Sequence, residues 1–151
     1  MTVRTEEVLA DLKRAGLKLT PQRIAIVREL SCAEDHPTAQ ELYERLRPLH
    51  PTMSFATVYN TIDALAELGL VGSLRLGGAV RFDPNTAPHH HAVCDACGTV
   101  IDLPAAPPSP SLKKSIEHVA GFEVRVEERT YRGLCSRCLN SFERRSVSRA
   151  L

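Results

Sequence analysis

The sequence lacks several features that would assign it to a broad class of protein. No run approaches the roughly 18 consecutive apolar residues that a membrane span requires, and Arg4, Glu6, Glu7 and Asp11 occupy the first dozen positions. Hydrophobic residues make up 43% and charged residues 25% of the chain, a composition that argues against disorder. We therefore expect a soluble cytoplasmic protein with no membrane partner.

The sequence also lacks an excess of basic or acidic residues. The net charge is +1, and the chain up to Asp83 carries 10 basic and 11 acidic residues, followed by 9 basic and 7 acidic residues. No global basic field therefore indicates a nucleic-acid partner, and DNA binding would need a local patch. Internal repeats are missing too, and 151 residues suffice for one domain or two small ones.

The first 69 residues have the periodicity of four helices. The first is predicted to have Thr5 as its N-cap and to end at Gly16, and the second runs to about Ser31. The predicted N-caps of the later three helices are Thr20 before a proline, Thr38 in a capping box, and Ser54. On the fourth helix the predicted apolar stripe consists of Phe55, Val58, Ile62 and Leu65, and Gly69 ends the helix.

Beyond Gly69 the apolar residues alternate, which predicts a β-hairpin turning at Gly77-Gly78. Helices followed by a hairpin are typical of a winged helix, whose last helix enters the DNA major groove. Asparagine can bond adenine there, and alanine and threonine methyl groups suit thymine. The candidate base contacts are Ala56, Thr57 and Asn60, and the candidate phosphate contacts are Tyr59, Arg23, Arg75 and Arg81. The alternative is a solvated polar helix face with isolated surface charges.

The second half contains two Cys-x-x-Cys pairs, Cys94 with Cys97 and Cys135 with Cys138, separated by 37 residues. This spacing favours a four-thiolate structural zinc site over a redox pair, because a disulfide across three positions would be strained. The fifth cysteine, Cys32, is expected to pack in the core. Other expected elements are a helix over about 111–120, a strand over 122–131 and a helix from 135 to about 145.

The histidines indicate a second metal site. His89 and His91 share a face if they lie on a strand, Asp83 and Asp102 flank them, and His36 could join by folding of its loop. Imidazoles with carboxylates suit divalent iron, manganese or zinc. The alternative from the residues alone is an exposed, histidine-rich polar loop.

Several motifs in fixed order resemble the ferric uptake regulator family over about residues 6–143. They are Leu19-Thr20-Pro21-Gln22-Arg23, His36-Pro37-Thr38-Ala39, Ser54-Phe55-Ala56-Thr57-Val58-Tyr59-Asn60, Arg81-Phe82-Asp83, His89-His90-His91-Ala92-Val93-Cys94-Asp95-Ala96-Cys97-Gly98 and Gly133-Leu134-Cys135-Ser136-Arg137-Cys138. The resemblance implies an α+β protein with an N-terminal winged helix-turn-helix domain and a small α/β dimerisation domain. We expect these domains at 1–83 and 89–151, with a hinge at 84–88.

The resemblance also implies a function: metal-dependent repression of transcription by a homodimer on double-stranded DNA, expected to be a palindromic A/T-rich operator. It implies structural Zn2+ on the four paired cysteines and regulatory Fe2+ or Mn2+ on a hinge site. The implied regulatory ligands are His36, Asp83, His89, His91 and Asp102.

Asp102 bears on the subgroup. Iron-sensing members of the family usually carry glutamate at this position, whereas peroxide-sensing members carry aspartate. Members of the family with a further metal site usually carry His and Asp at the positions of Pro88 and His90, and His at the position of Glu127. This sequence has none of these residues at those positions, so the further site is expected to be missing. These residues favour a peroxide-responsive repressor, oxidised at His36 and His89, over an iron-uptake or other divalent-metal regulator.

Two other classes of function compete with repression. A metal hydrolase could use the histidine and aspartate cluster with a bound water, but no candidate general base stands apart from the ligands. The other class is a zinc-stabilised protein-interaction module that does not touch DNA. Binding to an A/T-rich palindrome with and without divalent metal would separate the three classes, and we expect a protein that is not an enzyme.

Overall fold

The computed structural model describes residues 3–76, 78–105, 110–121, 123 and 126–141. Four helices come first: α1 (Val3–Arg14), α2 (Pro21–Ser31), α3 (Ala39–Leu46) and α4 (Phe55–Glu67). The three predicted caps of α2, α3 and α4 are confirmed, because the side chains of Thr20, Thr38 and Ser54 each accept a hydrogen bond from a first-turn backbone amide. The predicted cap at Thr5 is wrong, since α1 already includes Val3 and Thr5 is buried within it.

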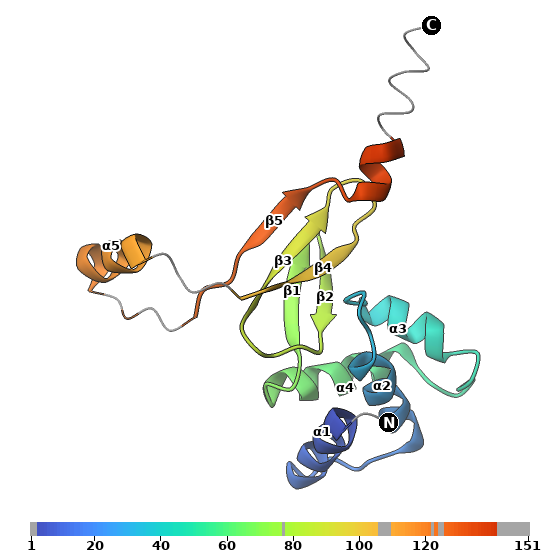
Figure 1. The fold of residues 1–151 in the computed structure, drawn as a ribbon. Helices are drawn as coiled ribbons and strands as arrows, with labels where there is room; N and C mark the ends of the chain where they lie inside the picture. The colour runs from blue at the N-terminus through green and yellow to red at the C-terminus, as the bar shows by residue number, and fades with distance from the viewer. Residues whose placement is uncertain (1–2, 77, 106–109, 122, 124–125, 142–151) are drawn as a thin grey trace, which may run out of the picture. The chain divides into compact units, whose positions relative to one another are not determined.

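The predicted hairpin is confirmed. Strands β1 (Gly72–Leu76) and β2 (Ala79–Asp83) pair antiparallel, with Leu76 opposite Ala79 at the turn. Gly78 has a φ of 87°, a left-handed conformation that glycine adopts without steric cost. Figure 1 shows the hairpin directly following α4, so this part of the chain has the helix-then-hairpin order of a winged helix.

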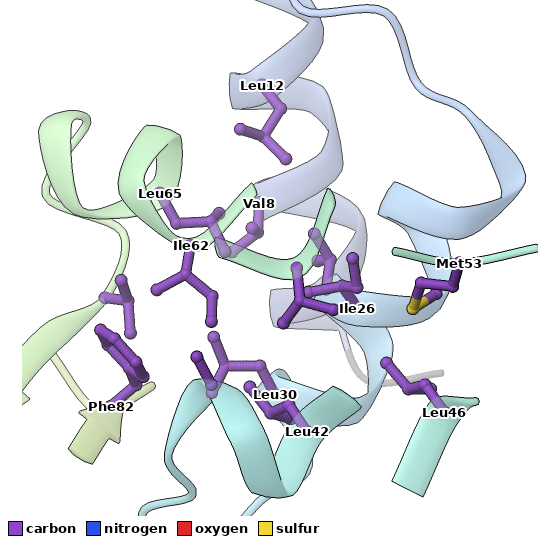
Figure 2. Packing of buried hydrophobic residues seen from close by; sticks show 14 residues of the cluster. Val8, Leu12, Ile26, Leu30, Leu42, Leu46, Met53, Ile62, Leu65 and Phe82 are labelled. Carbon is purple, nitrogen blue, oxygen red and sulfur yellow. The ribbon is translucent and has the colours of Figure 1, made fainter. Parts of the chain in front are cut away.

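One hydrophobic core joins the four helices to the hairpin. In Figure 2, side chains of all four helices and Phe82 of β2 converge on it. Three residues of the predicted stripe on α4 are buried, namely Val58, Ile62 and Leu65. Phe55 departs from the prediction, because its side chain is 41% exposed at the first turn of α4. The core therefore fixes which face of α4 remains available to a partner.

The second half forms a three-stranded sheet. Its central strand β3 (His89–Cys94) pairs antiparallel with β4 (Val100–Pro104) and parallel with β5 (Thr130–Gly133). Helix α5 (Pro110–Ala120) confirms the helix expected at 111–120, and residues 136–141 are helical. The remainder of the helix expected to reach Arg145 lies outside the described residues.

The expected strand over 122–131 is wrong in its bounds. Residues 122, 124 and 125 lie outside the described residues, and the described residues 126–129 are not strand. Strand β5 begins only at Thr130, which pairs with His91 of β3, and ends beside Cys94. The alternating pattern therefore located a strand in the right part of the chain. The first residue of β5 is set by its pairing with β3, which the pattern does not contain.

The chain divides into two compact units, Met1–Thr86 and Ala87–Leu151. Helices precede the hairpin in the first unit, and a mixed sheet with a helix makes up the second, so the fold is α+β as expected. Among the described residues, no helix has the length and apolar character needed to cross a membrane. The expected core position of Cys32 is wrong, because its side chain is exposed.

Candidate metal centres

Four cysteine thiols gather at the C-terminal end of β3. Cys94 ends this strand, Cys97 lies in the following turn, and Cys135 and Cys138 follow β5. Their four sulfur atoms lie within 4.8 Å of one another, and the Sγ atoms of Cys97 and Cys135 are 3.8 Å apart. Zinc–sulfur bonds of about 2.3 Å in a tetrahedron place sulfur atoms roughly 3.8 Å apart. The geometry of the donor set therefore fits one zinc ion.

Backbone hydrogen bonds assemble this cluster from two distant segments. The amide of Gly98 donates to the carbonyl of Cys94 at 2.8 Å, which closes the turn carrying Cys97. The amide of Asp95 donates to the carbonyl of Gly133 at 2.8 Å, and the amide of Cys135 donates to Cys94 Sγ at 3.3 Å. The parallel pairing of β3 with β5 thus delivers the second cysteine pair to the first.

The cluster is already partly prepared for a cation. A hydrogen bond from the Thr99 hydroxyl lowers the pKa of Cys97 from 9.0 to about 5, and the backbone amide of Cys135 lowers the pKa of Cys94. A hydrogen bond with Cys135 raises the pKa of Cys138 to about 12. Metal bound by all four sulfurs must therefore displace a proton from Cys138, so occupancy is expected to weaken as pH falls.

The N-terminal unit brings together two of the other predicted ligands. His36 lies in the loop between α2 and α3, and Asp83 ends β2; both are buried, and His36 Nε2 is 3.7 Å from Asp83 Oδ1. The backbone amide of Asn85 donates to Asp83 Oδ1 at 2.7 Å, which orients the carboxylate. An imidazole and a carboxylate so close together are suitable ligands for a divalent transition metal.

An ion pair holds the neighbourhood of His36. Arg45 on α3 donates to Asp35 and lies 3.7 Å from Glu29 on α2. The Arg45 hydrogen bond lowers the pKa of Asp35 from its ordinary 3.8, so this pair stays charged at neutral pH. The loop is thereby attached to the two helices that flank it.

The C-terminal unit brings together the remaining three predicted ligands. His89 and His91 lie on the same face of β3, and their Nε2 atoms are 3.6 and 3.9 Å from Asp102 Oδ1 on β4. The Nδ1 of His89 donates to the carbonyl of Ala87 at 2.7 Å, because a carbonyl can only accept. This bond selects the tautomer whose Nε2 carries the lone pair, the arrangement typical of a metal-ligating histidine.

The surface of α4 presents the other predicted side chains. Ala56, Tyr59 and Asn60 are exposed, whereas Thr57 is half-buried and its hydroxyl lies 2.9 Å from that of Ser54. Arg75 is exposed on β1. Arg23 is half-buried and its guanidinium donates to the Lys18 carbonyl at 2.9 Å, so one of its donors is already engaged.

Three contributors went unrecognised from the sequence. Thr99 lies two residues after Cys97 and its hydroxyl is 3.1 Å from the Cys97 sulfur; the short spacing between the two residues was the only sequence signal for this contact. Phe55 stacks edge-on against Tyr43 at 5.9 Å and lies 6.2 Å from the ring of Tyr59, and no periodic signal indicates this contact. Arg81 donates to the carbonyl of His36 at 3.0 Å, whereas the sequence indicated a phosphate contact or an isolated surface charge at this position.

Comparisons with known proteins agree with this arrangement. The sequence model described as "Ferric uptake regulator family" matches residues 14–128. The peroxide-responsive repressor PerR of Staphylococcus epidermidis is 38% identical over 134 residues, which cover 88% of this chain and 89% of the repressor. Such relatives are regulators of transcription rather than enzymes.

Solved structures give the same result. The ferric uptake regulator of Vibrio cholerae is 30% identical with a TM-score of 0.66, covering 82% of this chain and 96% of that one. PerR from Streptococcus pyogenes is 28% identical with a TM-score of 0.52, covering 89% and 92%. This chain therefore belongs to the ferric uptake regulator family.

Proposed function

We propose that this protein is a metal-dependent, DNA-binding repressor of transcription that acts as a cytoplasmic homodimer and responds to peroxide. The observation that carries the proposal is the separation of two donor chemistries along β3. Soft thiolates gather at its C-terminal end, whereas imidazoles begin it and meet a carboxylate of β4. Thiolates suit a permanently held zinc, and nitrogen and oxygen donors suit an exchangeable iron or manganese.

The four paired cysteines would hold the structural zinc, which supplies a crosslink between β3 and the segment after β5. The regulatory site would combine His36 and Asp83 of the first unit with His89, His91 and Asp102 of the second. Only residues 84–88 separate Asp83 from His89, so a shared metal would constrain the hinge between domain 1–83 and domain 89–151. Metal binding would then favour one orientation of the DNA-binding units.

The DNA contacts would come from the exposed face of α4, with phosphate contacts nearby. We assign base contacts to Ala56, Thr57 and Asn60, and phosphate contacts to Tyr59, Arg23 and Arg75. The Vibrio cholerae relative has DNA-binding domains, which supports this assignment. A palindromic A/T-rich operator would match the two-fold symmetry of a dimer.

The homodimer would form through the second unit, whose surface carries several exposed apolar side chains. They are Ile101, Val126, Tyr131, Leu134 and Leu139. Ile101, Tyr131 and Leu134 line one shared pocket, and an exposed apolar surface of this kind supports a second copy of the chain as the partner.

Peroxide sensing is supported by two similarities. PerR of Staphylococcus epidermidis is a peroxide-responsive repressor, and PerR of Streptococcus pyogenes senses peroxide and regulates genes. Ferrous iron bound by these nitrogen and oxygen ligands would supply the electrons that reduce hydrogen peroxide next to the ligating side chains. We assign the oxidation to His36 or His89, where an imidazole carbon would take up one oxygen atom of the peroxide while the other oxygen leaves as water. An oxidised imidazole is a poorer ligand, so its metal affinity would fall.

The competing function is iron-uptake regulation without peroxide sensing, as the likeness to the Vibrio cholerae ferric uptake regulator suggests. Both functions share the zinc site, the hinge site and the DNA face. They differ in whether oxidation occurs at the hinge histidines.

Replacing Cys94 or Cys138 with serine should remove the zinc and unfold or monomerise the protein, because metal binding and folding are coupled at such sites. Metal analysis should find one zinc per subunit in the wild type and almost none in either variant, with a matching loss of dimer in sedimentation. Cys32→Ser is the control, since Cys32 is exposed in the other unit. A zinc-free protein that remained a stable dimer would contradict the zinc assignment.

Replacing Tyr59 or Asn60 with alanine should weaken operator binding by roughly 1–3 kcal/mol each, the range for one good base contact. The measurement is fluorescence anisotropy with an operator duplex at saturating manganese. Glu67→Gln, near the end of the same helix, should cause no weakening. Unchanged affinity for both alanine variants would show that another face binds DNA.

His91→Ala should abolish metal-dependent operator binding while the cysteine zinc stays in place, because the imidazole belongs only to the hinge donors. Manganese titration and operator binding measured on one preparation provide the test. His50→Ala, in the loop after α3, serves as the histidine control. Normal repression by the His91 variant would remove the hinge site from the proposal.

Iron-loaded protein treated with modest peroxide should gain one oxygen on a peptide containing His36 or His89, as read by mass spectrometry. Manganese-loaded protein should be spared, since manganese does not support this chemistry under the same conditions. Oxidation confined to cysteines, or equal with both metals, would favour a metal sensor that does not detect peroxide through its histidines.

A further inference from the structure

His36 is held in a backbone conformation that its own sequence disfavours. Its φ is 51°, the only non-glycine residue in the left-handed region among those the structure describes, and Pro37 follows it. Left-handed backbone is uncommon for residues with a Cβ, and a following proline restricts the conformation further. Such a conformation persists only where neighbouring groups enforce it.

Strand β2 supplies those neighbouring groups. The amide of Phe82 donates to the carbonyl of Pro37 at 3.0 Å, and Thr38 and Arg81 form an isolated antiparallel bridge. The guanidinium of Arg81 donates to the carbonyl of His36 at 3.0 Å. Three consecutive residues of the loop are thus fixed by two consecutive residues of the strand.

The guanidinium of Arg81 is itself held in place from α3. Its Nη1 atom lies 3.4 Å from Oε2 of Glu41, the oxygen that accepts from the amide of Thr38 at 2.7 Å in the capping box. The Arg81 side chain is only 21% exposed. This position inside the unit contrasts with that of Arg75 on the partner strand, whose residue is exposed.

We propose that Arg81 is a positioning residue for the regulatory metal site, fixing the loop of His36 against the strand that carries Asp83. The inference rests on the proposed function, because it presumes that these two side chains bind metal. Arg81 is two residues from Asp83, and its bond to the carbonyl of His36 fixes the peptide that bears the imidazole. Removing the guanidinium should let the left-handed loop relax, so that imidazole and carboxylate are no longer presented together.

The experiment titrates manganese alone into zinc-loaded full-length protein by calorimetry. Arg81→Gln should bind manganese at least about ten-fold more weakly than the wild type, the range for the loss of a supporting group behind a ligand. Arg81→Lys keeps the charge and should recover part of the affinity. Arg47→Gln is the control, since it removes an exposed arginine from the same unit and should leave manganese affinity unchanged.

A second measurement does not involve metal. In metal-free Arg81→Gln, the amides of Thr38 and Phe82 should exchange hydrogen faster than in the wild type, while the amides of α4 keep their protection. If that variant fails to fold, Glu41→Gln replaces it, since it keeps a capping oxygen but removes the charge facing Arg81. Glu41→Gln should also weaken manganese binding, though less than the loss of the guanidinium.

Asp83→Asn separates the two possible failures. If Asp83→Asn loses manganese affinity but Arg81→Gln binds normally, the inference about Arg81 is wrong and the proposed metal site stands. If Asp83→Asn binds as the wild type does, the proposed site itself is wrong. If Arg81→Gln instead lowers operator affinity at saturating manganese and reduces the salt slope by about 1, Arg81 contacts a phosphate and the inference is overturned.

Discussion

The parallel pairing of β3 with β5 is the constraint on which the second unit depends. Only four residues of each strand are in register, from His91 opposite Thr130 to Cys94 opposite Gly133. Parallel strands need a long connection, and about 35 residues of chain lie between these two, so closing that loop costs entropy that so short a ladder hardly offsets. The cysteines sit where this pairing ends, and a metal held between them would keep β5 on β3. The same pairing supports the strand on which His89 and His91 stand.

In the first unit, the main structural requirement is that the irregular loop between α2 and α3 lie next to the end of β2. The loop between α2 and α3 has no ladder of its own, yet it carries a buried imidazole in a left-handed conformation. Arg45 attaches the loop to the helices through Asp35, and Arg81 attaches it to β2. These charge-assisted contacts act on backbone and carboxylate groups beside His36. The imidazole of His36 itself faces Asp83, with Nε2 3.7 Å from Oδ1 of the carboxylate.

Much of the fold could be predicted because its signals are local. The caps at Thr38 and Ser54 and the left-handed turn residue Gly78 depend on side-chain and backbone chemistry within four residues. The spacing of the cysteines likewise foretold a cluster. The exposure of Phe55 and Cys32, the late beginning of β5 and the inward bond of Arg81 could not be predicted. Each of these features depends on which residues, distant in sequence, pack alongside. The sequence pattern of an arginine in an alternating strand is the same whether its guanidinium binds a phosphate or, like Arg81, a backbone carbonyl.

The division of donors along β3 follows from strand geometry as much as from ligand chemistry. Alternation places His89 and His91 on one face, within reach of Asp102, which lies opposite His91 on β4. Cys94, an odd number of residues further along, points to the other face and meets thiols from the turn and from beyond β5. A single six-residue strand therefore keeps hard and soft ligands apart without an intervening domain. A shift of one residue in its register would exchange the two faces and destroy both donor sets, so the ladder that positions the thiols also decides where the imidazoles point.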